Sequence, residues 1–211
     1  MKTFYRRTFP HYQFDHSYYF VTFRLFNSLP IDIIQMLKGK YRKSESQIIR
    51  SVDESRRYSE LYNLQKKYFG IYDRYLDKSE SCTNYLADER IAKIVSDTLF
   101  FKDSIDYDLI CYCIMPNHVH MLLWIEWLMK PFYKIMQSIK RFSSRKSNLI
   151  INRSGTFWEE ENYDHIVRDR EEYIKIVKFI LTNPLRAGLV SKADDWEWIY
   201  CKYDMKKYKL I

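Results

Sequence analysis

Two apolar segments with only a short Pro-Asn link between them constrain the fold more than any other feature of this sequence. The segments are Tyr107–Met115 and His118–Glu126, and both are rich in the hydrophobic and β-branched residues that strands favour. Strands joined by so short a link pair as an antiparallel hairpin. The chain is therefore expected to contain an antiparallel sheet with this hairpin inside it.

The second segment begins with two of the five histidines in the chain, His118 and His120. Side chains alternate across a strand, so both histidines point to one face and Val119 points to the other. Two neighbouring imidazoles can bind one metal ion through neutral ring nitrogens. Two alternatives stay open: hydrogen bonds satisfy both histidines, or a zinc site joins Cys111 and Cys113 to them, although the cysteine and histidine pairs need not share a face across the turn.

Length and composition restrict the class of protein. With 211 residues, 46% of them hydrophobic and 29% charged, the chain fits one globular domain rather than a disordered segment. We expect a single domain over 1–211 with a helical insertion over about 31–77. Glu126 interrupts the longest apolar run before it reaches membrane-spanning length, and the start lacks a secretory signal. These features predict a reduced, cytoplasmic protein without a membrane segment.

Charge and aromatic content point to an anionic partner. The formal net charge is +8 and 18% of the residues are aromatic, including 19 tyrosines. Such a surface suits single-stranded nucleic acid, whose bases stack on rings and whose phosphates pair with cations. Lys130 to Trp158 contains no Asp or Glu, which favours phosphate contact over a merely solvated helix face. The candidate DNA-binding residues there are Lys134, Lys140, Arg141, Arg145, Lys146 and Arg153.

The remaining elements are predicted from hydrophobic periodicity and from residues that begin or end helices and strands. Ser17–Phe26 alternates aromatic and β-branched residues, which predicts a central strand. Pro30 precedes a helical region over Ile31–Asp77, which is expected to form two or more helices. The other expected elements are helices over Ala87–Phe101, Phe132–Ser144 and Glu171–Thr182 and a short strand around Thr156–Trp158.

Five stretches carry a family resemblance. They stand in this order along the chain: Tyr19–Leu25 (YFVTFRL), Met115–His120 (MPNHVH), Phe157–Trp158, Tyr163–Asp169 (YDHIVRD) and Asn183–Val190 (NPLRAGLV). Together they resemble the REP-associated tyrosine transposases and their insertion-sequence relatives, within the His-hydrophobe-His endonuclease superfamily. The resemblance implies an α+β fold, with a ferredoxin-like antiparallel β-sheet, helices packed on one side of it and a helical insertion after the first strand. It also implies binding of single-stranded or hairpin DNA.

The same resemblance implies a chemistry. In the family, paired histidines and a polar residue on a late helix hold Mg²⁺ or Mn²⁺, which assigns His118, His120 and Asn183 as metal ligands. A tyrosine about one helical turn before the polar residue attacks the scissile phosphate. The resulting 5′-phosphotyrosine conserves the bond energy, so strands can be rejoined. In this chain the nucleophile position is Phe179, and phenylalanine has no hydroxyl.

The missing hydroxyl leaves more than one function open. The first is an active single-strand transposase that uses another tyrosine, for which Tyr163 is the candidate. Tyr173 is a poor substitute, because it lies ten residues from Asn183 and is expected in the core. The second is a domesticated, catalytically inactive protein that binds single-stranded DNA, and the third is a general nucleic-acid-binding module.

The segment around Tyr163 supplies two more candidates for DNA contact, His165 and Arg168. Asp164 precedes His165, and an Asp-His pair suggests a base, although a structural role for His165 is equally compatible with the sequence. The resemblance also leaves a homodimer open, because relatives differ on whether the nucleophile helix serves its own subunit or a neighbour.

Overall fold

The computed structural model describes residues 4–6, 10–78 and 83–203. The chain divides into two compact units. The larger unit combines Met1–Phe26 with Asn84–Ile211, and the smaller unit is Asn27–Thr83.

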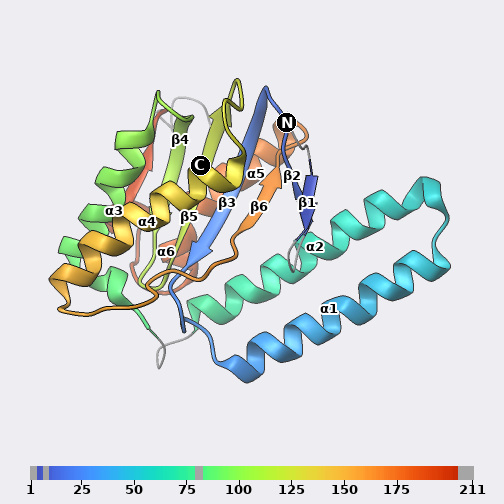
Figure 1. Cartoon of the computed structure of the whole chain (residues 1–211), viewed down its shortest axis with the longest axis horizontal. Helices are drawn as coiled ribbons and strands as arrows, with labels where there is room; N and C mark the ends of the chain where they lie inside the picture. Colours follow the sequence, from blue (N-terminus) through green and yellow to red (C-terminus); the bar gives the residue numbers. More distant parts are fainter. Residues whose placement is uncertain (1–3, 7–9, 79–82, 204–211) are drawn as a thin grey trace. The chain divides into compact units, whose positions relative to one another are not determined.

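The larger unit is built on a five-stranded antiparallel sheet with the strand order β6–β3–β5–β4–β7 (Figure 1). Its centre contains the predicted hairpin, and β3 pairs with the other side of β5 along its whole length. The antiparallel sheet predicted from the sequence is therefore confirmed. The strand bounds are β3 (Ser17–Arg24), β4 (Asp108–Ile114), β5 (His118–Ile125), β6 (Tyr163–Ile166) and β7 (Ile199–Cys201).

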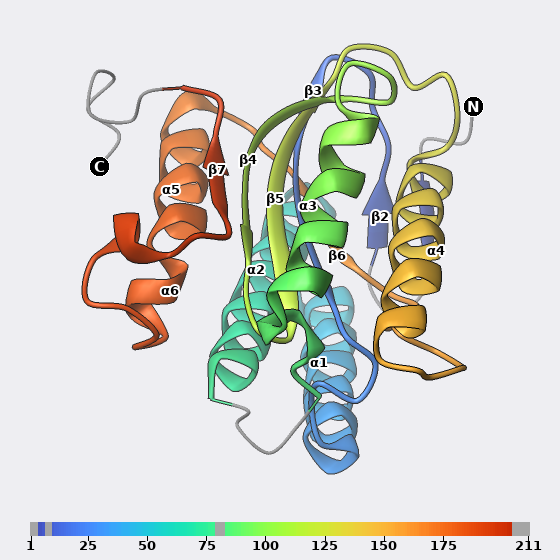
Figure 2. The same ribbon diagram turned by 90° about the vertical axis from the view of Figure 1, so that its left-hand side faces the viewer.

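Helices cover both faces of this sheet (Figure 2). On one face, α3 (Glu89–Lys102) and α4 (Phe132–Ile150) bury the main core, which includes Tyr19, Val21 and Phe23 of β3. On the other face, α5 (Arg170–Leu181) packs on the alternate side chains of β3, among them Tyr18 and Phe20. The expectation of helices on one side only is wrong. Both faces of β3 are aromatic, so both need an apolar cover.

One predicted helix end and one predicted strand also differ from the structure. α4 continues past the predicted end at Ser144 to Ile150. The predicted end came too early because the inward-facing positions there include the polar Ser143 and Ser147, which do not continue the hydrophobic pattern. The predicted strand around Thr156–Trp158 is wrong. Only a single bridge pairs Trp158 with Leu25 there.

The smaller unit is the predicted helical insertion and contains two helices, α1 (Ile31–Ser51) and α2 (Glu54–Asp77). They pack through contacts such as the edge-to-face pair of Tyr41 and Tyr68, whose ring centroids are 5.3 Å apart. The insertion follows β3, the first strand of the main sheet. A separate two-stranded sheet, β1 (Phe4–Arg6) with β2 (Pro10–Tyr12), precedes β3 in the chain.

The remaining elements are short: the 3₁₀ turns η1 (Tyr85–Ala87) and η2 (Ala193–Asp195) and the helix α6 (Asn183–Arg186). In the described part of the chain, no helix combines the length and the apolar character needed to cross a membrane.

A buried ion pair ties β2 to the edge strand β6. His11 Nδ1 lies 2.5 Å from Asp164 Oδ1, and Asn162 Nδ2 donates to the same oxygen at 2.7 Å. Burial alone would lower the pKa of His11, but hydrogen bonds to Asp164 and Glu161 outweigh burial and raise the pKa to about 9. The charged pair therefore fastens the N-terminal segment to the sheet.

This ion pair predicts a loss of stability in mild base. The folded pKa of His11 lies above the ordinary value of 6.5, so its contribution is full below pH 6.5 and disappears as the pH rises through about 9. The free energy of unfolding should fall by about 3 kcal/mol across this interval. Urea unfolding followed by tryptophan fluorescence measures it. A His11→Gln variant should show a flat profile there, and an equally steep fall in that variant would refute the assignment.

Candidate functional site

The two predicted metal-binding histidines lie at the start of β5 and face one another. Their Nε2 atoms are 2.9 Å apart, and their ring centroids are 4.6 Å apart with the planes inclined at 77°. Two nitrogens that bind one ion at about 2.1 Å stand roughly 3.0–3.4 Å apart. The pair thus already has close to the spacing that a shared divalent ion requires. His118 and His120 are both fully buried.

The other ring nitrogens of the histidines are held by neighbours that orient both rings. His118 Nδ1 donates to Asn117 Oδ1 at 2.6 Å, which leaves its Nε2 as an acceptor when the ring is neutral. His120 Nδ1 lies 2.7 Å from Thr22 Oγ1 on the neighbouring strand. A hydroxyl can donate or accept, so Thr22 can support either tautomer of His120. Such partners orient metal-binding histidines in known sites.

Sequence reasoning missed both orienting residues. Asn117 precedes His118 and belongs to the quoted motif, so its polar side chain was a usable signal. Thr22 is 98 residues from His120 along the chain and becomes its partner only through the pairing register of β3 with β5.

Asn183, the predicted third ligand, is fully buried at the start of α6. Neither its amide nitrogen nor its amide oxygen has a hydrogen-bond partner within the described part of the chain. Burying an amide in this way costs on the order of 1–3 kcal/mol. A ligand-binding role would account for the cost, and an amide oxygen is a suitable donor for Mg²⁺ or Mn²⁺. α5 ends at Leu181, within one residue of the predicted end at Thr182, and Asn183 begins the separate short helix α6.

Phe179, at the predicted nucleophile position, packs against His120. Its ring centroid lies 5.2 Å from that of His120 and 5.8 Å from that of Phe20. The guanidinium carbon of Arg186 stands 4.2 Å from the Phe179 centroid, a cation–π contact. Arg186 belongs to the quoted Asn183–Val190 stretch, but sequence reasoning gave it no role. The structure therefore brings a cation to the ring at the predicted nucleophile position.

Tyr163 lies in a row of side chains that runs across the sheet to His120. In the strand register, Tyr163 is opposite Thr22 and Thr22 is opposite His120, so all three share the face covered by α5. The Tyr163 ring contacts Phe20 at 6.0 Å and stacks on His165 at 6.4 Å. One strand separates Tyr163 from His120, which is roughly 10 Å of backbone distance.

The predicted pairing of Asp164 with His165 does not occur. Consecutive strand residues face opposite ways, so Asp164 pairs with His11 on one side while His165 lies on the other. His165 Nε2 is 3.2 Å from Glu172 Oε2, and the backbone N–H of Arg168 donates to the same carboxylate. Both predicted DNA contacts in this segment are therefore also part of the connection between β6 and α5.

Tyr173 is half-buried near the start of α5, where its ring packs on Tyr18 with centroids 4.9 Å apart. The expectation that it lies in the core is wrong, since it lines an open pocket. Burial raises the pKa of the Tyr173 hydroxyl well above its usual range, which opposes a nucleophilic role.

The structure fulfils one requirement of the alternative zinc site, a shared sheet face, but does not bring the ligands together. Cys113 is opposite His120 in the β4–β5 register, so the two side chains share one face of the sheet. The sequence alone had left this open. Among the described residues, however, no cluster of three or more metal-binding side chains includes a cysteine. Burial raises the pKa of the Cys111 thiol, which opposes the thiolate form that zinc needs.

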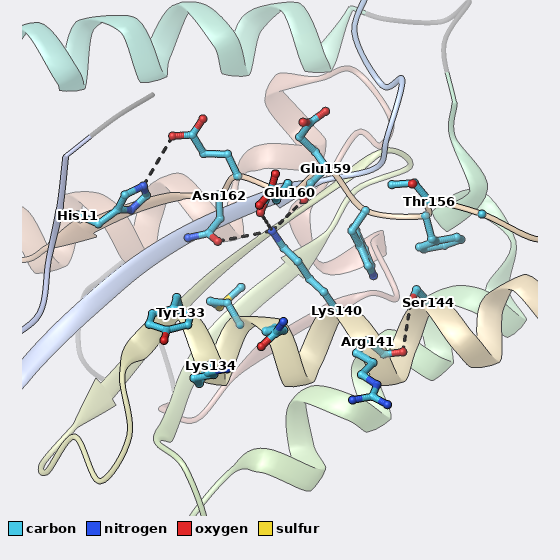
Figure 3. Close-up of a pocket in the computed structure, with 16 residues that line it drawn as sticks. His11, Tyr133, Lys134, Lys140, Arg141, Ser144, Thr156, Glu159, Glu160 and Asn162 are labelled. Atoms are coloured by element: carbon cyan, nitrogen blue, oxygen red, sulfur yellow. Dashed lines mark hydrogen bonds and ion pairs between the residues drawn. The ribbon is translucent and has the colours of Figure 1, made fainter. Parts of the chain in front are cut away.

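The predicted basic residues lie mostly on the outer side of α4, and groups from other segments meet two cations of this stretch. Lys130 pairs with Asp106 at 2.6 Å. Lys140 reaches across a pocket of about 370 Å³ to donate to the carbonyls of Glu159 and Glu160 (Figure 3). The exposed members of the set are Lys134, Arg141, Arg145, Lys146 and Arg153. Lys140 therefore has a structural role in addition to its predicted one.

Comparison with known proteins agrees with this fold. A Haemophilus influenzae protein whose curated name assigns it to the REP-associated tyrosine transposases is 21% identical over 112 residues. The match covers 47% of this chain and 62% of that protein. A solved structure of a REP-associated tyrosine transposase bound to a REP hairpin superposes with a TM-score of 0.52 at 16% identity. The superposition covers 92% of this chain and 80% of that one, and it supports the shared fold.

A family model gives the most specific match. The model described as "Transposase IS200 like" matches residues 77–182, half of the chain, and this range ends one residue before Asn183. The matched range includes His118, His120 and Phe179. On this evidence the chain belongs to the IS200-like transposase family.

Proposed function

We propose that this protein binds hairpin-forming single-stranded DNA and does not form a covalent intermediate through the usual nucleophile position. One observation carries the proposal: the ring of Phe179, the position at which the resemblance predicts the nucleophilic tyrosine, packs on His120 at 5.2 Å and has no hydroxyl. Hairpin binding is supported by family membership, by the structural relative whose title describes a bound REP hairpin, and by the net charge of +8.

His118, His120 and Asn183 would hold a divalent ion, Mg²⁺ or Mn²⁺. The fit rests on the facing Nε2 atoms and on the buried Asn183 amide. A bound ion would polarise a DNA phosphate. The chain itself orients the rings through Asn117 and Thr22 and excludes water from the pair by burying both histidines.

DNA contact is assigned to cationic side chains on the surface. Lys134, Arg141 and Arg145 are exposed on α4 and can neutralise backbone phosphates. Lys146 and Arg153 extend the same basic surface, and Lys140 keeps its position at the adjacent pocket. His165 and Arg168 are also proposed to contact DNA. Both lie beside the carboxylate of Glu172 in the first turn of α5.

A second candidate function is cleavage through Tyr163. The observation that favours it is the cross-strand row Tyr163–Thr22–His120, which places a hydroxyl-bearing residue on the same sheet face as the histidines. In this case Tyr163 would make the phosphotyrosine in place of residue 179. Location in the cytoplasm and assembly into a homodimer stay predictions of the sequence.

The test combines binding with adduct formation. The native chain is mixed with labelled hairpin DNA and with an unstructured strand of equal length, and affinity is measured by fluorescence anisotropy. Tighter binding of the hairpin is expected. Denaturing electrophoresis after incubation with Mn²⁺ should show no covalent adduct.

Each other outcome selects a different function. Equal affinity for both strands would indicate a general nucleic-acid-binding module. An adduct from the native chain that disappears in Tyr163→Phe would establish the second candidate, and one that persists would place the nucleophile elsewhere.

A further inference from the structure

A chain of aromatic rings crosses the larger unit at the end of the α5-covered face that is remote from the histidine pair. We name it the aromatic track, and it consists of Trp127, His16, Trp124, Tyr18 and Tyr173. Successive ring centroids lie 4.4, 6.5, 4.6 and 4.9 Å apart. The start of α5 meets β3 here through the contact of Tyr173 with Tyr18. Trp124 and His120 are four residues apart on β5, roughly 13 Å, so the track is a separate feature.

Trp127 forms the open end of the track. Its side chain is 62% exposed, which is a large exposure for a tryptophan in a defined position. Two hydrogen bonds hold the loop that carries it: His16 N–H donates to the Glu126 carbonyl, and Leu128 N–H donates to Asp15 Oδ1. His16 adopts a left-handed backbone conformation with φ of 49°, and its ring packs edge-on against Trp127. These contacts place the indole beside His16 with much of its surface open to solvent.

The other end of the track opens into a pocket of about 560 Å³. Tyr18, Tyr173 and the exposed Tyr203 line it with aromatic surface, and Arg168 and Arg170 line it with positive charge. Burial raises the pKa of the Tyr18 hydroxyl, so this surface stays uncharged. Asp169 is the one acidic residue among the lining residues that the structure describes.

We propose that the aromatic track and its pocket bind unpaired nucleotides that flank the hairpin, with bases stacked on Trp127 and on the pocket tyrosines and phosphates paired with Arg168 and Arg170. The proposal rests on the proposed function. Open aromatic surface at Trp127 and in the pocket, together with the arginines of the pocket, is the combination that single strands require, because stacking accepts any base and arginine pairs with the backbone. A protein partner could also use tyrosine and arginine, so protein binding is an outcome of the test.

The test compares two DNA ligands, one hairpin with several unpaired nucleotides on each side and the same hairpin with blunt ends. Trp127→Ala should weaken binding of the tailed hairpin by roughly five- to a hundredfold, the range for loss of one stacked base. Binding of the blunt hairpin should stay unchanged. Trp127→Phe should restore most of the affinity, because an aromatic face returns. Phe101→Ala removes another exposed aromatic, 67% exposed on α3, and should change neither affinity.

The possible failures are distinguishable. If the native chain binds no hairpin at all, the proposed function fails. If it binds tailed and blunt hairpins equally, or if Trp127→Ala weakens both or neither, the function stands and the aromatic track is not a nucleotide site. An unchanged DNA affinity in Trp127→Ala, together with loss of self-association in sedimentation, would assign the track to protein contact and overturn the proposal.

Discussion

Phe179→Tyr is expected to produce a covalent protein–DNA adduct in the presence of Mn²⁺, where the native chain produces none. The substitution adds one hydroxyl to a ring that already packs on His120 and lies under Arg186. A guanidinium beside a phenol favours its ionised, nucleophilic form. Removing an essential nucleophile costs on the order of 10⁶-fold in rate in a well-studied hydrolase, so restoring one should raise adduct formation by several orders of magnitude.

The readout is a shifted band on denaturing electrophoresis with labelled hairpin DNA. Phe142→Tyr is the matched control, because it adds the same hydroxyl to an exposed ring on α4 far along the chain. The double variant Phe179→Tyr with His120→Ala should give no adduct. If Phe179→Tyr binds the hairpin and Mn²⁺ yet gives no adduct, the rest of the site has also lost its catalytic geometry.

His120→Ala is expected to lower the affinity for Mn²⁺ by at least about a hundredfold. It removes one of two neutral nitrogens that already stand at ligand spacing, and His118→Ala should have the same effect. Thr22→Val removes only the group that orients His120, so about a tenfold loss is expected. Isothermal titration calorimetry or the electron paramagnetic resonance of free Mn²⁺ measures these affinities without DNA. Unchanged affinity in both alanine variants would exclude the histidine pair as the metal site.

Asn183→Leu separates a ligand from a structural residue. If Asn183 is a ligand, it contributes to Mn²⁺ affinity. In the metal-free protein it lowers stability, because its buried amide has no hydrogen-bond partner in the described part of the chain. The variant keeps the branched shape, so it should bind Mn²⁺ more weakly while its metal-free unfolding free energy rises by about 1–3 kcal/mol. A stability loss with unchanged affinity would instead show a purely structural residue.

The local elements could be predicted because neighbours in the chain determine them. The alternation in Ser17–Phe26 and the short link before His118 predict two strands of one antiparallel sheet, and the structure confirms both. Asp169 and Pro131 mark where α5 and α4 begin. The end of α4 was not predictable, since Ser143 and Ser147 are buried without being hydrophobic.

The basic surface shows where composition misleads. The stretch from Lys130 to Trp158 contains no acid, yet the fold brings Asp106 to Lys130 and the carbonyls of Glu159 and Glu160 to Lys140. Charge counted along a segment therefore overstates the charge that a partner meets at Lys130, because Asp106 from another part of the chain neutralises it, whereas the carbonyls hold Lys140 in place without cancelling its charge.

The sequence by itself determined the antiparallel sheet, the place of His118 and His120 on one face and the absence of a hydroxyl at Phe179, since each depends on residue identity and local periodicity. Tertiary structure alone decided that Thr22 holds His120 and that Arg186 covers Phe179. It also placed helices on both faces of the sheet. The physical reason is register: which side chains meet across strands and helices far apart in sequence depends on how the whole core packs, and a shift of one residue would turn every strand side chain to the opposite face.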